Sequence, residues 1–237
     1  DFASLAGLAR SSGASVFADD AQYAPTHQVG AAASGADALA FSGHKLGAPF
    51  GTGVLWVKKA LLGRLEPSKV GGGVVKSVRA SGAGFKVEYL KNYQGFEAGI
   101  QNYSGAVAMS SAFKTLSDLG HEAIRAHMAE LVSYAYERLG GLKEIKILGE
   151  SGELAQGALI SFIPAGHAFA AADLNIFLNT YYKDRFMALR TGRHCADLAS
   201  LASGLAGTVR LSFFVYSSKS DIDEFVRALQ KYLSFLR

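Results

Sequence analysis

Cysteine is almost absent from this chain, because Cys195 is the only one among 237 residues. A single cysteine excludes an intrachain disulfide and a metal site built from several cysteines. An unpaired cysteine suits a reducing compartment, so we expect a cytoplasmic protein. The six histidines show no metal-ligand spacing, so no metal site is expected either.

Long hydrophobic runs and blocks of like charge are also missing. No apolar stretch approaches the roughly 20 residues of a membrane-spanning helix, so we expect no membrane contact. The formal net charge is only +4, and its Lys and Arg residues form no basic block. This argues against a nucleic-acid partner. Hydrophobic residues make up 49% of the chain, enough to form the core of one large domain or two modest ones.

Strand-like and helix-like patterns alternate along the chain, which predicts an α/β architecture. The expected strands are residues 14–18, 38–41, 53–57, 144–148, 158–163, 187–190 and 209–215. The expected helices are residues 104–119 and 122–139, and a last helix that begins at the capping pattern Ser220-Asp221-Ile222-Asp223. Its apolar face would comprise Ile222, Phe225, Val226, Leu229, Leu233 and Leu236. Residues 70–93 are rich in Gly, Ser and Val and predict a loop and hairpin.

The most informative stretch is Ser42-Gly43-His44-Lys45, which directly follows the strand predicted at 38–41. Asp19 follows the first predicted strand, and the connection between the two is long enough for a parallel crossover. Ligands gather at the carboxyl ends of strands in open α/β sheets, so we expect Asp19 and Lys45 to face one crevice. A lysine amine, a carboxylate and phosphate-binding donors together suit Schiff-base chemistry with pyridoxal phosphate.

The residues by themselves leave plainer alternatives open. Lys45 could be a solvated loop charge, and Asp19 could cap a turn or a helix. The glycines around Lys45 could only make turns. Cys195 could be a small buried hydrophobe.

Taken together, the motifs resemble the class V aminotransferase-like enzymes of fold type I. Asp19-Asp20-Ala21-Gln22, followed by residues 41–46, is similar to the core signature of that family. Residues 190–196, Arg-Thr-Gly-Arg-His-Cys-Ala, resemble the active-cysteine segment of the second group of cysteine desulfurases, which includes selenocysteine lyase-like enzymes. Residues 71–73 and 96–102 match further segments of the family in the expected order.

The resemblance implies an α/β fold that corresponds to the C-terminal part of an aspartate aminotransferase-like enzyme. Residues 1–105 would be the C-terminal part of the large domain that binds pyridoxal phosphate. Residues 106–237 would be a small C-terminal α/β domain that carries the active cysteine. The family's N-terminal part would come from a separate polypeptide or from a longer protein.

The resemblance also implies roles for individual residues. Lys45 would hold pyridoxal phosphate and shuttle the substrate's α-proton. Cys195 would attack the sulfur of L-cysteine, keep it as a persulfide and release L-alanine. The other implied contacts are Asp19 and Gln22 to the cofactor ring, Ser42 and His44 to the phosphate, and Arg210 and Arg190 to the substrate.

These roles imply a cysteine desulfurase that mobilises sulfur, for example for iron–sulfur cluster assembly. The alternatives are a selenocysteine lyase or cysteine sulfinate desulfinase, and an inactive or split relative that acts as a scaffold or sulfur-transfer partner. The implied partners are a second copy of the chain in a homodimer and a sulfur-acceptor or scaffold protein.

Two positions depart from the family pattern. Ile100 stands where members usually have a Thr that reaches the cofactor phosphate of the partner subunit. Arg193 stands where members often have His, which adds positive charge near Cys195. Together with Arg190 and His194, this charge is expected to favour the thiolate.

Overall fold

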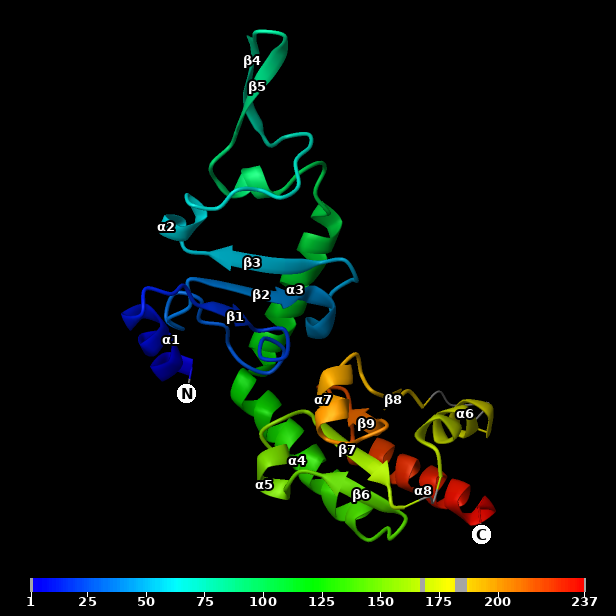
Figure 1. Cartoon of the computed structure of the whole chain (residues 1–237). Helices are drawn as coiled ribbons and strands as arrows, with labels where there is room; N and C mark the ends of the chain where they lie inside the picture. Colours follow the sequence, from blue (N-terminus) through cyan, green and yellow to red (C-terminus); the bar gives the residue numbers. More distant parts are fainter. Residues whose placement is uncertain (1, 167–168, 182–186, 237) are drawn as a thin grey trace. The chain divides into compact units, whose positions relative to one another are not determined.

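The computed structural model describes residues 2–166, 169–181 and 187–236, and it divides into two compact units. Unit 1 is Asp1–His121 and unit 2 is Glu122–Arg237 (Figure 1). The domain boundary between residues 105 and 106 that the resemblance implies stays a prediction. The α/β fold class is confirmed, because each unit combines a sheet with helices.

Unit 1 holds a three-stranded sheet, a hairpin and the helices around them. Its elements are α1 (Phe2–Ser11), β1 (Phe17–Asp19), β2 (Ala38–Ser42), the 3₁₀ helix η1 (Gly43–Leu46), β3 (Gly53–Val57), α2 (Lys59–Leu62), β4 (Val75–Ser81), β5 (Gly84–Tyr89), the 3₁₀ helix η2 (Tyr93–Phe96) and α3 (Tyr103–Leu119).

The sheet has the order β1-β2-β3, with β1 parallel and β3 antiparallel to the central strand β2. The predicted parallel crossover between the first two strands is therefore confirmed. The helix α3 lies against this sheet, where Phe113 packs edge-on against Phe41 of β2 at 5.5 Å between ring centroids. The expected start of the first strand at residue 14 is wrong, because the ladder begins only at Phe17.

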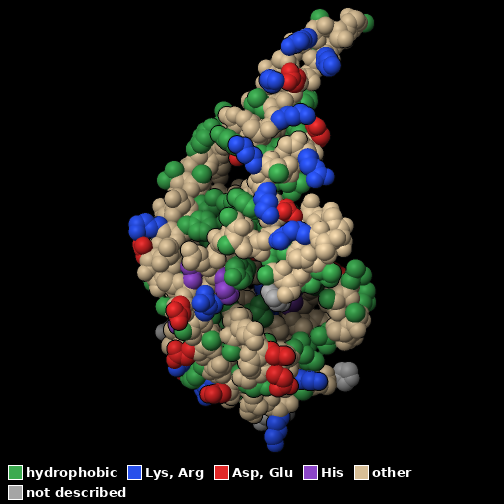
Figure 2. Space-filling view, turned by 90° about the vertical axis from the view of Figure 1, so that its left-hand side faces the viewer, with side chains coloured by type: hydrophobic (Ala, Val, Ile, Leu, Met, Phe, Trp, Pro, Cys, Tyr) green, Lys and Arg blue, Asp and Glu red, His purple; other side chains and the backbone are tan. Residues whose placement is uncertain are grey.

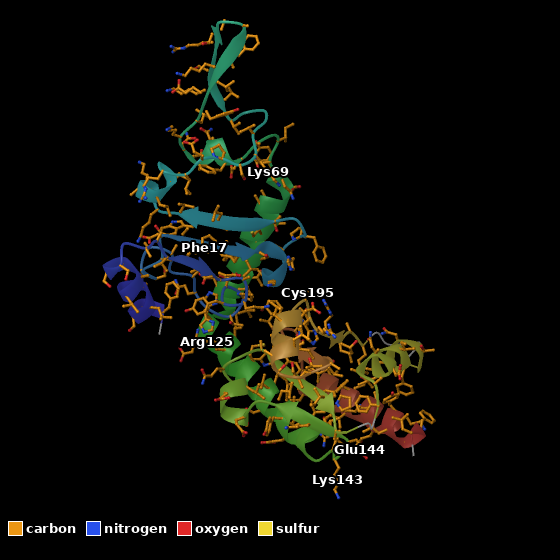
Figure 3. All side chains as sticks on the ribbon, in the orientation of Figure 1. Phe17, Lys69, Arg125, Lys143, Glu144 and Cys195 are labelled. Atoms are coloured by element: carbon orange, nitrogen blue, oxygen red, sulfur yellow. The ribbon has the colours of Figure 1, made fainter. Side chains whose placement is uncertain are left out.

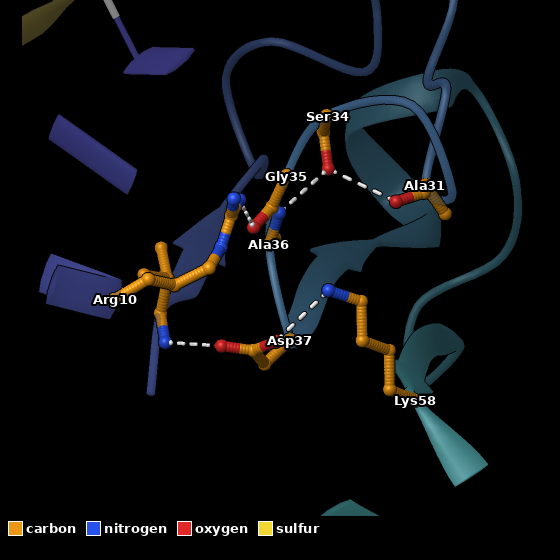
Figure 4. A network of polar contacts seen from close by, with 8 residues as sticks. Arg10, Ala31, Ser34, Gly35, Ala36, Asp37 and Lys58 are labelled. Atoms are coloured by element: carbon orange, nitrogen blue, oxygen red, sulfur yellow. Dashed lines mark hydrogen bonds and ion pairs between the residues drawn. The ribbon is translucent and has the colours of Figure 1, made fainter. Parts of the chain in front are cut away.

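The residues before β1 are held by a polar network instead of a ladder (Figure 4). The Asp37 carboxylate accepts hydrogen bonds from the backbone N–H of Val16 and from Lys58 Nζ, both at 2.9 Å. Arg10 donates to the Gly35 carbonyl at 2.6 Å, which fastens α1 to the same connection. This network sets where β1 and β2 begin, and thus where their carboxyl ends fall.

The predicted hairpin is also confirmed, as the antiparallel pair β4 and β5. Figure 1 shows it extending away from the three-stranded sheet, and Figure 2 shows Lys and Arg side chains along it. The register places Val78 opposite Val87 and Ala80 opposite Phe85 on one face of the ribbon. Arg79 and Lys86 are paired on the other face, next to the pair of Ser77 and Glu88, so the ribbon has one apolar and one polar side.

Unit 2 is a four-stranded antiparallel sheet with helices. Its elements are α4 (His121–Gly140), β6 (Ile145–Leu148), α5 (Ser151–Leu154), β7 (Leu159–Pro164), α6 (Ala171–Tyr181), β8 (Arg190–Gly192), α7 (Asp197–Ala202), β9 (Thr208–Ser212) and α8 (Lys219–Phe235). The strand order is β6-β7-β9-β8.

One face of this sheet is apolar and packs on the last helix. Ile160, Phe162, Val209 and Leu211 are buried, and Phe162 lies 6.3 Å from Phe225 of α8 between ring centroids. By the alternation of side chains along a strand, Thr208 and Arg210 point to the opposite face. The two faces therefore have different tasks: one forms the core and the other carries polar side chains.

Most predicted boundaries in unit 2 hold to within one residue, and the larger differences are at β8, the end of β9 and the start of α8. The strand predicted at 187–190 lies instead at Arg190–Gly192, and the strand predicted to reach residue 215 ends at Ser212. It ends there because the Phe214 N–H bonds to the Ser217 hydroxyl in a turn. The last helix begins earlier than predicted, because the capping box joins Ser218 and Asp221.

The amphipathic face of α8 is confirmed except at its end. Ile222, Phe225, Val226, Leu229 and Leu233 are buried. The prediction for Leu236 is wrong, because this residue follows the helix and is 49% exposed. In the part of the chain that the structure describes, no helix is both long and apolar enough to cross a membrane.

Replacing Asp37 with Asn is expected to destabilise unit 1 at neutral pH. The hydrogen bond from Lys58, and next the one from Val16, lower the pKa of the Asp37 carboxyl. A lowered pKa contributes stability above the unfolded value of about 4, and this contribution is lost as the pH falls through the folded value. The thermal midpoint of Asp37→Asn should therefore lie below that of the unmodified chain at pH 7, and the gap should close in acid.

A matched control is Asp118→Asn, which removes an exposed ion pair to Lys114 within α3. Exposed pairs of this kind contribute little, so its midpoint should hardly move. Equal losses in both variants, or a gap that widens in acid, would contradict the role of Asp37.

Candidate active site

The candidate residues fall into two groups, one in each unit. Asp19, Gln22, Ser42, His44 and Lys45 belong to unit 1. Arg190, Cys195 and Arg210 belong to unit 2. Each group is built by the sheet of its own unit.

In unit 1 the residues follow the carboxyl ends of two parallel strands. Asp19 is the last residue of β1 and is in register with Ala40 of β2, while Ser42 is the last residue of β2. Lys45 follows in η1. Because the strands are parallel, these residues lie at one end of the sheet, as the sequence predicts. Asp19 also accepts a hydrogen bond from the Ala21 N–H at 3.0 Å, so it caps the turn that presents the exposed Gln22.

The Lys45 turn is held by its neighbours in the chain. Leu46 is 2% exposed and anchors the turn in the core, and Gly47 ends it in the left-handed conformation with φ of 92°. His44 is exposed, and its ring stacks on Phe50 at 5.5 Å between centroids. Lys45 itself is half-buried. A glycine suits position 47, because left-handed backbone is strained for other residues.

Gly43 leaves no room for a side chain. A Cβ there would collide with Thr52 Oγ1 and lie 3.1 Å from Met109 Sδ of α3. Thr52 Oγ1 is itself held by the Pro49 carbonyl at 2.7 Å, and the Gly43 N–H donates to the Thr52 carbonyl at 2.9 Å. The turn that carries Lys45 is therefore packed directly against the start of β3 and against α3.

Two further segments that resemble the family lie together in unit 1. The Gly99 N–H donates to the Gly72 carbonyl at 2.8 Å, which joins residues 71–73 to residues 96–102. Asn102 ends the second segment and caps α3 by accepting from the Gly105 N–H at 2.9 Å. Ile100, which belongs to the second segment, is 94% exposed. Since the Ile side chain has no hydrogen-bonding group, it cannot donate to a phosphate as a Thr hydroxyl would.

The donor set of unit 1 fits pyridoxal phosphate. Among the described residues, neither the Lys45 amine nor the Asp19 carboxylate has an ion-pair partner, so both charged groups are available for a ligand. The group also supplies an amide, a hydroxyl and an imidazole, in Gln22, Ser42 and His44. An amine, a carboxylate and several phosphate-binding donors are the groups that this cofactor requires.

In unit 2 two arginines are directly opposite each other on neighbouring strands. Arg190 of β8 is in register with Arg210 of β9, on the polar face of the sheet. Arg210 Nε is buried and, among the described residues, has no hydrogen-bond partner. Like charges opposite each other destabilise a sheet, and a buried donor without a partner adds to this. A carboxylate would satisfy both arginines, because a guanidinium binds it through two parallel hydrogen bonds.

Cys195 lies in a turn between β8 and α7 and is exposed (Figure 3). The alternative that it is a buried hydrophobe is therefore wrong. His194 and Cys195 have φ of 56° and 60°, and the Ala196 N–H donates to the Arg193 carbonyl at 2.9 Å. This is the φ signature of a type I′ turn, which Gly, Asn and Asp favour. Left-handed backbone costs roughly 1–2 kcal/mol for an ordinary residue, so this turn is strained.

The charges around Cys195 differ from the sequence-based expectation. Burial, followed by the charges of Arg210 and Arg190, lowers the pKa of His194, which disfavours the charged form of its ring. Arg193 forms an ion pair with Asp197 at 3.0 Å, which offsets its charge. His194 is therefore a weaker source of positive charge than the sequence suggests, and Arg190 and Arg210 remain as cations of this region.

The sequence analysis missed two residues that shape the site. Thr208 contacts His194, with 2.7 Å between Oγ1 and Nε2. Thr52 packs on Gly43, as described above. Neither residue has a local signal, because each acts on a segment distant in the chain. In the described part of the chain, no cluster of three or more His, Cys, Asp or Glu residues could hold a metal ion.

The family model described as "Aminotransferase class-V" matches residues 1–225 of this chain. A protein named "Probable cysteine desulfurase" from Halobacterium salinarum is 35% identical over 227 residues, which cover 96% of this chain and 52% of that protein. A protein named "Cysteine desulfurase" from Haloferax volcanii is 34% identical, with 95% and 50% coverage. The chain thus spans about half the length of the curated relatives it matches.

Solved structures of cysteine desulfurases are also similar to this chain. The cysteine desulfurase CsdA of Escherichia coli has a TM-score of 0.86 and 31% identity, covering all of this chain and 56% of that one. The cysteine desulfurase of Thermococcus onnurineus has a TM-score of 0.85 and 30% identity, with 99% and 56% coverage.

Replacing Gly43 with Ala is expected to destabilise unit 1 and displace the Lys45 turn. The new methyl group would overlap Thr52 Oγ1, and overpacking of this kind typically costs about 1–3 kcal/mol. The free energy of unfolding in urea measures the loss. Gly7→Ala is the matched control, because a Cβ at Gly7 in α1 meets no atom within 4 Å and Ala favours helix. A loss no larger than in this control would show that the turn has room to shift.

Proposed function

The chain belongs to the class V aminotransferase family, and we propose that it acts within a pyridoxal-phosphate-dependent cysteine desulfurase. The observation that carries the proposal is in unit 2. An exposed cysteine lies in a strained turn that follows β8, and Arg190 of β8 is in register with Arg210 of β9, whose buried Nε has no partner among the described residues. This pairs a sulfur nucleophile with a carboxylate site, as a cysteine substrate requires.

The family uses pyridoxal phosphate, and five residues of unit 1 would hold it here. Lys45 would bond to the aldehyde, Asp19 would pair with the ring nitrogen, and Gln22 would bond to the ring oxygen. Ser42 and His44 would donate to the phosphate. When bound, the cofactor supplies an electron sink that weakens the bonds at the substrate's α-carbon.

The chain's own groups would then divide the work. Arg210, together with Arg190, binds the carboxylate of L-cysteine and orients it. The Lys45 amine accepts and returns the proton at the α-carbon. Cys195 Sγ forms a bond to the substrate sulfur as the carbon–sulfur bond breaks. The products are L-alanine and a persulfide on Cys195.

The division of labour along the chain follows from these roles. We assign cofactor binding to residues 1–105 and the active cysteine to the smaller domain at residues 106–237. The exposed Cys195 can pass its persulfide to a sulfur acceptor or scaffold protein, and a free thiol suits a reducing cytoplasm. A homodimer is proposed through the segment that contains Ile100.

Cofactor attachment is tested by borohydride reduction followed by denaturing intact mass. The full chain, purified with any polypeptide that accompanies it and incubated with pyridoxal phosphate, should gain one reduced cofactor that maps to Lys45. Lys45→Ala should lose this adduct. Lys59→Ala, which changes an exposed lysine of α2, should keep it. An adduct that survives in Lys45→Ala would place the cofactor elsewhere.

The role of Cys195 is tested by Cys195→Ala. Removing the nucleophile should lower alanine and sulfide formation from L-cysteine at least about 100-fold. Ser200→Ala on the neighbouring helix α7 is the control and should keep the activity. A lyase on selenocysteine or cysteine sulfinate would be favoured if the parent shows no cysteine desulfuration and Cys195→Ala still releases selenium from selenocysteine or sulfite from cysteine sulfinate. A parent that binds no cofactor would favour a scaffold.

A further inference from the structure

The turn that carries Cys195 cannot be explained by its own sequence. Positions 194 and 195 both have left-handed backbone, yet neither is Gly, Asn or Asp. One backbone hydrogen bond, from the Ala196 N–H to the Arg193 carbonyl, closes the turn. A strained turn of this kind persists only where the surrounding structure holds it. The question is which contact does so.

The contact is a side-chain hydrogen bond to the neighbouring strand. His194 Nε2 and Thr208 Oγ1 are 2.7 Å apart in a part-buried position. Thr208 is the first residue of β9 and is in register with Gly192, the last residue of β8. The bond therefore ties the turn to the strand that also carries Arg210.

The base of the turn is equally tight. A Cβ at Gly207 would lie 2.9 Å from Gly192 Cα, so the two backbones approach as closely as glycine permits. Gly192 has φ of 101° and starts the change of direction. The backbones of Gly192 and Gly207 are therefore in close contact where the turn begins, and the side chain of His194 bonds the turn to β9.

We propose that His194 is a positioning residue, whose bond to Thr208 holds the left-handed turn and so keeps Cys195 beside Arg190 and Arg210. Burial and the charges of Arg210 and Arg190 lower the pKa of His194, whereas its hydrogen bond to Thr208 acts in the opposite direction. Both arginines lie close enough to His194 for their charges to contribute to that shift. The next residue in the turn, Cys195, is thereby brought to the carboxylate site.

The proposal rests on the proposed role of Cys195, but it can be tested without enzymatic activity. Cys195 is the only cysteine, so every alkylated thiol is this one. In both iodoacetate and iodoacetamide the thiolate displaces iodide and forms a sulfur–carbon bond, which adds a carboxymethyl or a carbamidomethyl group; only iodoacetate carries a carboxylate. The ratio of the two rates therefore reports whether the thiol lies beside the arginines, and it cancels changes in exposure common to both reagents.

The full chain should show an iodoacetate to iodoacetamide ratio about threefold above that of the same chain unfolded in urea, as expected for one screened charge contact. Thr208→Val removes the hydroxyl at nearly constant shape, and its ratio should fall to the unfolded value. Thr208→Ser restores the hydroxyl and should restore the ratio. Thr191→Val makes the same chemical change on β8, opposite Val209, and should leave the ratio unchanged.

The variant His194→Asn tests the side-chain contact with Thr208 separately from the left-handed backbone conformation. Asn tolerates left-handed conformation better than most residues, but its shorter side chain cannot reach Thr208 Oγ1 as the imidazole does. A lower alkylation ratio in His194→Asn supports the role of the bond between His194 and Thr208. If Thr208→Val does not fold, His194→Asn takes its place in the comparison with Thr208→Ser. Thermal midpoints identify any such unfolded variant.

Three outcomes would overturn the proposal. They are a parent ratio equal to that of the unfolded chain, a wild-type ratio in a folded Thr208→Val, and a Thr208→Ser ratio as low as that of Thr208→Val. If the desulfurase assay fails but the alkylation ratios follow the expected pattern, the proposed function is overturned and the positioning role of His194 remains.

Discussion

The buried strand β2 is the constraint on which unit 1 depends. It pairs with β1 on one side and β3 on the other, and Leu39 is only 1% exposed. A central strand with buried side chains cannot slip by one residue without turning its apolar set outward. Its end at Ser42 therefore places the Lys45 turn, and Gly43 allows that turn to pack against Thr52 and α3.

A comparable constraint acts in unit 2 through the two faces of its sheet. Val209 and Leu211 point to the apolar side, where Phe162 packs on α8. The residue between them, Arg210, must then point to the other side, where the register brings Arg190 opposite to it. Core packing thus produces the charged pair, and the repulsion between the two arginines is a property that an anionic substrate would relieve.

Much of the architecture could be read from local patterns. The parallel pair, the hairpin and the buried face of α8 follow from periodicity, crossover length and turn composition, each a property of neighbouring residues. The boundaries were less well predicted. Val16 leaves the ladder because its N–H binds Asp37, 21 residues away, and β9 stops where Ser217 captures the Phe214 N–H. Such competing hydrogen bonds have no periodic signature.

The site divides along the same line. The types of reactive groups and their order are visible in the amino-acid sequence: a lysine after one strand, an aspartate after another, one cysteine and two arginines in recognisable motifs. Folding is required to bring Arg190 opposite Arg210, to lower the pKa of His194, and to hold Cys195 in a left-handed turn whose His194 contacts Thr208. The reason is physical. Residue chemistry is local, whereas strand register, burial and the contacts that hold strained backbone arise only when distant segments pack together.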